Sequence, residues 1–288
     1  MKKATKVGAF LVTLLSLLWI TEKSWADPIS VFVSILPQKY FVERIGGKEV
    51  NVEVMVKSGE SPATFNPNPK KMSRLSQARL YFSIGVPFET IWIDRIQSIH
   101  PGLKIIPLHE QIDKTTAHKL DARHSHGKTD PHIWTSPAKV KTIASKIKET
   151  LARNLPQKAE YFEKNLKSFS NDLDVLDKNI RSVLAKSDNR RFMVFHPAWS
   201  YFARDYGLEQ ISIEQDGKEP GARAMQKTIE KGKNLGIKVI FVQKQFSLSI
   251  AENIAKVIGA TVHEMDPLAE NYLENMQRTA TAISGALR

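Results

Sequence analysis

The chain has 288 residues, a formal net charge of +12 and no cysteine. Its length suits two domains of ordinary size. The lack of cysteine excludes disulfides and thiolate metal sites, so any metal would be bound by His, Asp or Glu. The positive charge does not indicate nucleic-acid binding, because the lysines and arginines are interspersed with acids and form no patch interleaved with aromatic residues.

Residues 1–26 are typical of a cleavable signal peptide. Lysines precede an apolar run from residue 7 to residue 20, and Ser24-Trp25-Ala26 supplies the small residues of a cleavage site. A membrane anchor is the weaker alternative, because the apolar run is shorter than the roughly 20 residues that span a bilayer. No cysteine is available for lipid attachment. We therefore expect an exported periplasmic protein without a lipid anchor.

From residue 27 to residue 155, short apolar strands alternate with helices. Strands are predicted at 31–35, 50–56, 80–84 and 103–106, and helices from Pro37 to Gly46 and at 71–78, 91–99 and 137–151. Such alternation predicts an α/β lobe with a mainly parallel sheet.

Residues 156–187 predict one long amphipathic helix. Its apolar residues follow 4-3-4-3-4-3 spacing, which places them on a single stripe: Phe162, Leu166, Phe169, Leu173, Leu176, Ile180 and Val183. One interpretation of the stripe is the seam of a coiled-coil dimer. We favour a helix laid across two domains, because α/β patterns lie on both sides of it.

After residue 188 the alternation resumes. Strands are predicted at 192–195, 208–213, 239–242 and 261–264, and helices at 198–206, 222–235, 250–258 and from 268 onward. The predicted fold class is therefore α/β, with lobes at 27–155 and 188–288 joined by the long helix at 156–187.

The loop before residue 137 concentrates metal-binding side chains. His124, His126 and His132 lie with Asp130 within nine residues. Neutral imidazole is a common zinc ligand, and a His-rich tract on a turn-forming background is typical of metal binding. For His124 and His126, a solvated loop without ligands remains the alternative.

Two polar residues follow predicted strands of the second lobe. His196 comes after the strand at 192–195, and Asp266 comes after the strand at 261–264. Ligands of open α/β sheets bind beyond the carboxyl ends of strands, so both residues are expected at one edge. If His132 faces that edge from the first lobe, two imidazoles and a carboxylate meet, which suits zinc. The structural alternatives are a helix cap for His196 and a turn for Asp266.

At these motifs the chain resembles the metal-specific solute-binding proteins of zinc and manganese ABC importers, the ZnuA/TroA-like group. The resemblance is carried, in order, by residues 58–67, 130–134, 195–202 with 205–208, and 266–268. It implies two lobes bridged by a rigid helix, with one divalent metal ion bound in the cleft between them. It also implies delivery of the ion to an ABC permease in the inner membrane with its ATPase. We expect a monomer without enzymatic activity.

The resemblance implies His132 as the second ligand, His196 as the third and Asp266 as the fourth. The family normally has a histidine after Ser-Pro as first ligand, but this chain has Ala63 there, which cannot bind a metal. Either water fills the position or another residue does, with His126 favoured and His124 next. Histidine at the third position resembles the zinc-type members, and nitrogen ligands favour Zn²⁺ over Mn²⁺ as cargo.

The acidic loop after the strand at 208–213 leaves two interpretations open. Glu214 or Glu219 could orient an imidazole or contact the permease, but a solvated loop is the preferred interpretation. An exported zinc-dependent hydrolase is the alternative function, because the missing ligand at Ala63 would leave a coordination position open to water. Metal affinity is expected to fall as the pH drops through ~6.5, since protonated imidazole binds no metal.

Overall fold

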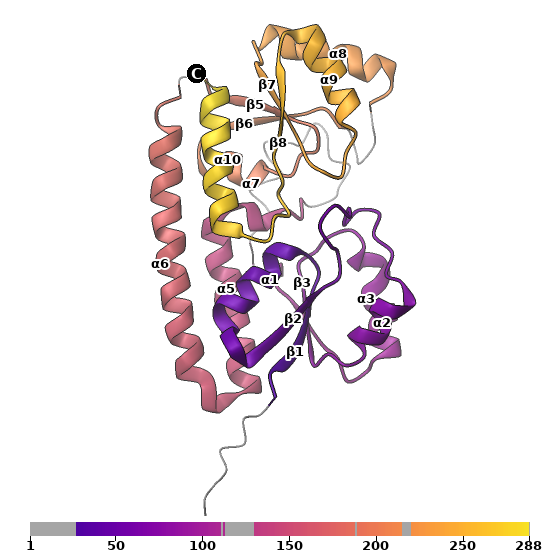
Figure 1. Ribbon diagram of the computed structural model, residues 1–288, viewed down its shortest axis with the longest axis vertical. Coiled ribbons are helices and arrows are strands. Elements are labelled where there is room, and N and C mark those ends of the chain that lie inside the picture. The colour runs from indigo at the N-terminus through magenta and orange to yellow at the C-terminus, as the bar shows by residue number, and fades with distance from the viewer. Residues whose placement is uncertain (1–26, 111, 113–129, 188, 215–219, 288) are drawn as a thin grey trace, which may run out of the picture.

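The chain folds into two α/β lobes, each built on a four-stranded parallel sheet (Figure 1). The computed structural model describes residues 27–110, 112, 130–187, 189–214 and 220–287. The predicted signal peptide at 1–26, the two loop histidines His124 and His126, and Glu219 lie outside the described residues. In the part of the chain that is described, no helix combines the length and the apolar character needed to cross a bilayer.

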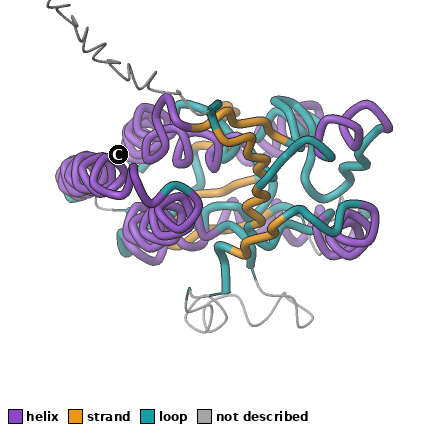
Figure 2. The backbone as a smooth tube through the Cα atoms, turned by 90° about the horizontal axis from the view of Figure 1, so that it is seen from below, coloured by secondary structure: helices purple, strands orange, loops and turns teal. Residues whose placement is uncertain are grey.

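The first sheet has the strand order β2-β1-β3-β4, with all strands parallel. Its strands and connecting helices are β1 (Ile29–Val33), α1 (Leu36–Gly46), β2 (Val50–Val54), α2 (Pro69–Leu75), β3 (Leu80–Ser83), α3 (Glu89–Ile99) and β4 (Lys104–Pro107). All four residues of β3 are buried, as expected for a parallel strand with helices on both faces of its sheet (Figure 2). Gly47 ends α1 with a φ of 53°, a conformation that favours glycine.

The second sheet repeats this topology with the order β6-β5-β7-β8. Its elements are β5 (Arg191–Val194), α7 (Ser200–Asp205), β6 (Glu209–Ser212), α8 (Ala222–Asn234), β7 (Val239–Val242), α9 (Leu248–Ile258), β8 (Thr261–Glu264) and α10 (Tyr272–Ala286). The predicted fold class is confirmed; β7 and β8 have their predicted bounds, and the other strands and helices differ from theirs by at most a few residues at an end.

Helices α5 (Pro137–Asn154) and α6 (Ala159–Leu184) connect the two sheets. The predicted stripe on α6 is the buried face of that helix, and α5, α1 and α10 of the same chain pack against it. The coiled-coil seam is therefore the wrong interpretation, because the stripe already has partners within the chain. Figure 1 shows α6 running alongside both lobes.

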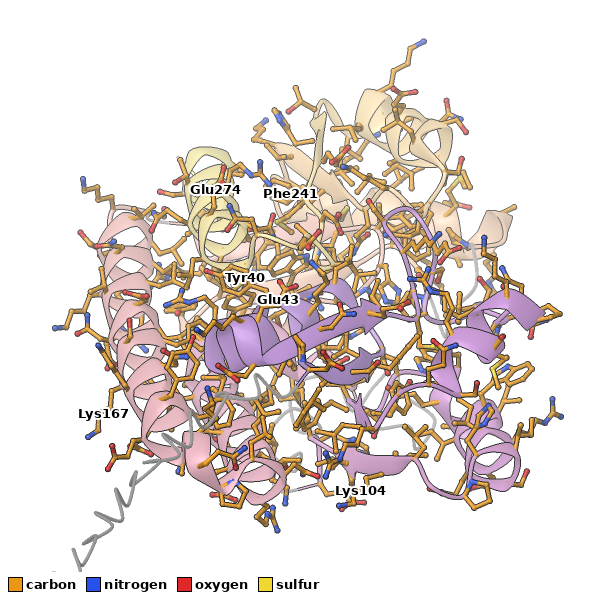
Figure 3. All side chains as sticks on the ribbon, turned by 60° about the horizontal axis from the view of Figure 1, so that its bottom comes forward. Tyr40, Glu43, Lys104, Lys167, Phe241 and Glu274 are labelled. Atoms are coloured by element: carbon orange, nitrogen blue, oxygen red, sulfur yellow. The ribbon has the colours of Figure 1, made fainter. Side chains whose placement is uncertain are left out.

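The last helix, α10, contacts the first lobe across the lobe boundary. Tyr272 of α10 lies edge-on to Phe41 of α1, with ring centroids 4.9 Å apart, and Tyr40 packs on the same tyrosine at 6.5 Å. Figure 3 shows Tyr40 and its neighbour Glu43 on α1, close to α10. An ion pair between Lys39 and Glu270 crosses the same boundary. Although it is last in the sequence, α10 thus packs against α1 of the first lobe and against α6.

A buried carboxylate occupies the carboxyl edge of the first sheet. Glu89, the first residue of α3, is 3% exposed. Its carboxylate accepts hydrogen bonds from the backbone N–H groups of Ile84 (3.0 Å) and Gly85 (2.7 Å) and from the Ser34 hydroxyl. Burial raises the pKa of Glu89 to about 7, although these hydrogen bonds oppose the shift.

The raised pKa of Glu89 gives the stability of the protein a defined pH dependence. Between about pH 4.5 and pH 7 the folded state holds a proton on Glu89 that the unfolded state has lost. The contribution of Glu89 to the free energy of unfolding therefore falls by about 3 kcal/mol as the pH rises. Replacing Glu89→Gln is expected to remove this dependence of the free energy of unfolding on pH. Urea unfolding at pH 4.5 and at pH 7.5 measures it. The matched control is Glu252→Gln on the exposed face of α9. If the free energy of unfolding changed with pH by the same amount in the wild type and in Glu89→Gln, the raised pKa of Glu89 would be contradicted.

Candidate metal centre

Two histidines far apart in the sequence meet at the boundary between the lobes. The Nε2 atoms of His132 and His196 lie 3.3 Å apart, and the two rings stand edge to face at 5.1 Å. His132 lies just before the single turn η2 (Ile133–Thr135) that leads into α5, and His196 lies two residues beyond β5. The structure therefore brings together two of the predicted ligands.

Each imidazole is held by a carboxylate at its other nitrogen. His132 Nδ1 lies 2.7 Å from Asp130 Oδ1, and His196 Nδ1 lies 2.7 Å from Glu214 Oε2. An ionised carboxylate only accepts hydrogen bonds, so both Nδ1 atoms carry a hydrogen, and in the neutral rings both Nε2 atoms then keep a lone pair. Both lone pairs are then available at the point where the rings meet, an arrangement typical of metal-binding histidines and their supporting carboxylates.

Asp130 holds the imidazole of His132, a contact to which the sequence analysis assigned no role. Besides the imidazole, its Oδ1 accepts the backbone N–H of His132 at 2.9 Å, which closes an Asx turn around Pro131. Burial alone would raise the pKa of Asp130, but the charge of His132 and the hydrogen bonds it receives outweigh burial and place the pKa below its usual value. The signal was the Asp-Pro-His spacing, which puts carboxylate and imidazole on one turn.

Glu214 corrects the preferred interpretation of its loop. A solvated position is wrong, because Glu214 is 4% exposed and bonded to His196. The pairing of β5 with β6 explains the contact. Val194 pairs with Ser212, and the backbone bond from Glu214 N to Phe195 O (2.9 Å) extends this pairing past the strand ends. Glu214 is thereby placed next to His196.

The backbone of His196 is clamped by a buried amide. Gln243, 2% exposed and directly after β7, accepts the N–H of His196 at 3.3 Å and donates to its C=O at 2.9 Å. Phe246 stacks on the imidazole at 5.1 Å with an interplanar angle of 20°. The predicted alternative of a helix cap is wrong for His196, because α7 begins only after Trp199. Gln243 was missed, although it directly follows the strand next to β5.

Asp266 follows β8, and its loop is tied to the His132 segment. Asp266 Oδ1 accepts the N–H of Leu268 at 2.8 Å, as the turn alternative predicted. Burial raises the pKa of this carboxyl above its usual value, while the hydrogen bond from Leu268 opposes the shift. The next carbonyl, that of Pro267, accepts the indole N–H of Trp134 at 2.8 Å, and the Trp134 ring packs on His132 at 5.2 Å.

The described residues bring together two of the three predicted ligands that they include. Among them, no group of three or more His, Asp or Glu side chains is arranged to hold a metal ion. Asp266 as a ligand stays a prediction, as do His124 and His126, which lie outside the described residues. Ala63 is exposed and offers only a methyl group.

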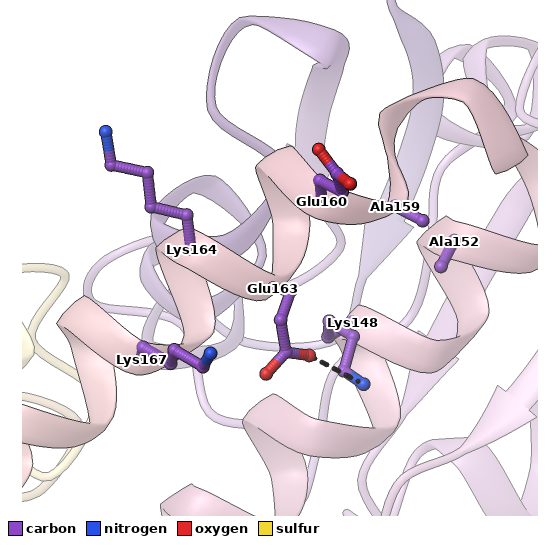
Figure 4. A pocket seen from close by; sticks show the side chains of 7 residues that line it. All are labelled: Lys148, Ala152, Ala159, Glu160, Glu163, Lys164 and Lys167. Carbon is purple, nitrogen blue, oxygen red and sulfur yellow. Dashed lines mark ion pairs between the residues drawn. The ribbon is translucent and has the colours of Figure 1, made fainter.

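A separate surface hollow lies between α5 and α6 (Figure 4). It is lined by Lys148, Ala152, Ala159, Glu160, Glu163, Lys164 and Lys167. Lys148 pairs with Glu163 at 3.1 Å. Because this lining contains no histidine and its three ammonium groups have no lone pair to offer, the hollow does not suit a metal ion.

The comparisons with known proteins identify sequence relatives of this chain. The family model ZnuA, described as zinc-uptake complex component A, periplasmic, matches residues 31–286. The zinc-binding protein AdcA of Streptococcus pyogenes serotype M3 is 27% identical, over 83% of this chain and 50% of the relative. The zinc-binding lipoprotein AdcA of Streptococcus pneumoniae serotype 4 is 25% identical, over 98% of this chain and 60% of the relative. The chain thus spans only half to three fifths of these relatives.

Solved structures resemble the whole fold. A crystal structure of ZnuA superposes with a TM-score of 0.85 and 37% identity, covering 91% of this chain and 100% of that one. A ZnuA deletion mutant with zinc bound has the same TM-score and identity and is covered over 98% of its length. The laminin-binding protein Lmb of Streptococcus agalactiae, 22% identical at a TM-score of 0.80, shares the fold.

Gln243 is expected to stabilise the folded chain through its two bonds to the backbone of His196. Gln243→Met keeps the volume but leaves the N–H and C=O of His196 without these partners, which costs about 2 kcal/mol in the free energy of unfolding. Urea unfolding measures the loss. The matched control is Gln245→Met, because the buried side-chain nitrogen of Gln245 has no hydrogen-bond partner among the described residues. Equal stability of the two variants would refute the clamp.

Proposed function

We propose that this chain, which belongs to the ZnuA family of periplasmic zinc-uptake components, binds zinc between its lobes and delivers it to an ABC importer. Zinc is the cargo of the protein and not a resident cofactor. The relatives support this cargo, because AdcA is named a zinc-binding protein and one similar ZnuA structure holds zinc.

The observation that carries the proposal is the spacing of the two Nε2 atoms. Zinc binds imidazole nitrogen at about 2.0–2.1 Å in a tetrahedral arrangement, so two ligand nitrogens on one ion lie about 3.3 Å apart. His132 Nε2 and His196 Nε2 are 3.3 Å apart. With both Nδ1 atoms bonded to carboxylates, the Nε2 lone pairs of the two neutral rings repel each other unless a proton or a metal ion lies between them. The pair has the dimensions of one edge of a zinc tetrahedron.

We propose that Asp266 is the fourth-position ligand and that His126 or His124 replaces the first-position ligand that Ala63 cannot supply. Asp266 uses Oδ1 for its turn, and the carbonyl of the next residue, Pro267, accepts the indole N–H of Trp134, whose ring packs on His132. The loop that carries His124 and His126 leads directly into Asp130 and His132. These two histidines would compensate for Ala63.

We propose transport and not catalysis as the role of the site. Both histidines already have carboxylate partners that favour metal binding through Nε2, and the relatives are described as binding proteins. Two imidazoles favour zinc over manganese, which prefers oxygen ligands.

The cellular setting is proposed on the same basis. The protein would be exported by the signal peptide at 1–26 and act in the periplasm as a monomer, with lobes at 27–155 and 188–288 and the bridging helix at 156–187. Its partner would be a permease in the inner membrane with its ATPase. The S. pneumoniae relative is named a lipoprotein, whereas this sequence contains no cysteine that could carry a lipid.

Removing either imidazole is expected to abolish tight zinc binding. His132→Ala and His196→Ala each lose a ligand, so zinc affinity should fall by about 100-fold or more, at or beyond the upper end of losses for supporting residues. Competition with a zinc-sensitive chelator and calorimetry measure the affinity, with a parallel manganese titration. The control is His263→Ala, an exposed histidine of β8. A wild-type protein that binds no zinc, or prefers manganese, would overturn the proposal.

The loop histidines are tested by the double variant His124→Ala, His126→Ala. If one of them is a ligand, zinc affinity should fall about tenfold or more, while the ion remains bound to the His132–His196 pair. Isothermal titration gives affinity and stoichiometry together. Unchanged affinity and stoichiometry would show that neither histidine is a ligand, and water would then fill the coordination position that Ala63 cannot.

A further inference from the structure

The loop of His132 belongs to the first half of the sequence, yet residues of the second half hold it. The Tyr201 hydroxyl donates to the Asp130 carbonyl at 3.2 Å, and the Ser200 side chain is hydrogen-bonded to the Asp130 carboxylate. Both anchors lie in the first turn of α7. Asp130 in turn holds the imidazole and the backbone N–H of His132.

The anchor continues into the second sheet. The side-chain amide of Gln210, on β6, makes two hydrogen bonds. Its Nε2 donates to Ser200 Oγ at 3.0 Å, and its Oε1 accepts the backbone N–H of Trp199 at 2.7 Å. Glu214, the partner of His196, stands just beyond the end of the same strand. One strand of the second lobe therefore supports both imidazoles, the first through Gln210, Ser200 and Asp130, and the second directly through Glu214.

The residues after His132 are attached to the second lobe as well. Ser136, which caps α5, bonds to the carboxylate of Asp205 at the end of α7. Trp134, 1% exposed, donates to the carbonyl of Pro267. The segment from Asp130 to Ser136 thus contacts α7 and the loop after β8, both of which follow the bridging helix in the sequence.

We propose that Tyr201 and Ser200 are positioning residues that fix His132 to the second lobe through Asp130, so that the two imidazoles form one preformed zinc half-site on that lobe. The inference rests on the proposed function for its cargo and deepens it. Movement of the first sheet relative to the second then leaves the spacing between the nitrogens unchanged. Zinc then binds to the pair without closure of the lobes, because the folded protein already orients both imidazoles before the ion arrives.

The test compares two tyrosines at α7. The double variant Tyr201→Phe, Ser200→Ala removes both anchors but keeps the aromatic ring at position 201. Lys139 Nζ and Arg204 Cζ lie 5.3 Å and 5.1 Å from the centroid of that ring. Zinc affinity is expected to fall by about 10-fold or more, the range for lost supporting contacts. The matched control is Tyr206→Phe, which loses a hydroxyl bonded to Asp177 on α6 at 2.9 Å. Its zinc affinity should equal that of the wild type.

A spectroscopic readout separates positioning from general loss of stability. Long-range ¹H–¹⁵N spectra of the metal-free protein should show His132 and His196 as Nδ1–H tautomers in the wild type and in Tyr206→Phe. In the double variant, His132 should become a mixture of tautomers while His196 stays unchanged. Asp130→Asn, which keeps an oxygen acceptor for Nδ1–H, should restore the tautomer that Asp130→Ala loses. If the double variant does not fold, Tyr201→Phe alone provides the comparison.

The outcomes distinguish this inference from the proposed function. Wild-type affinity and a pure His132 tautomer in the double variant would overturn the inference, while zinc binding by the wild type would still support the function. A wild type that binds no zinc would refute the function, and the tautomer spectra would still decide whether the second lobe positions His132.

Discussion

The candidate metal centre depends on the Nε2 atoms of His132 and His196 being held 3.3 Å apart. Left to themselves, two rings in this arrangement would rotate, exchange tautomers or separate, because nothing in the pair alone favours it. The protein prevents this with carboxylates at both Nδ1 atoms, a stacked phenyl ring on His196 and an indole ring on His132. The energy that orders the site comes from the surrounding fold, so the proposed zinc cargo would not have to supply it.

The two lobes share one topology but use the same place in it differently. In each sheet the strand order reverses direction between its first and third strands, and such switch points are where α/β sheets bind ligands. In the second sheet this point holds His196, clamped by Gln243. In the first sheet the protein fills it with its own carboxylate, that of Glu89, bonded to the N–H groups of Ile84 and Gly85. The first lobe therefore has Glu89 at its switch point, where the second lobe has His196.

Aspartate followed by proline occurs twice at the lobe boundary and turns the chain in the same way each time. Asp130 accepts the N–H of His132 and Asp266 accepts that of Leu268, each two residues further on. The first turn presents an imidazole, and the second presents its own carbonyl and that of Pro267, which accept hydrogen bonds from Asn275 and Trp134. Because Trp134 bridges the two turns, the predicted ligands His132 and Asp266 are linked through structure even though they are not in one cluster.

The sequence by itself determined the α/β class, the alternation of strands and helices and the long helix, because these follow from periodicities that act over a few residues. It also singled out His132 and His196, because a histidine near Asp-Pro or after a buried strand is a local pattern. Only the tertiary structure decided the partners. Glu214 adjoins His196 through strand pairing, Gln243 through the neighbouring strand β7, and Asp130 is held by α7 from the other half of the chain. Those contacts join residues 18 to 71 positions apart, and no local pattern specifies which distant groups will pack together.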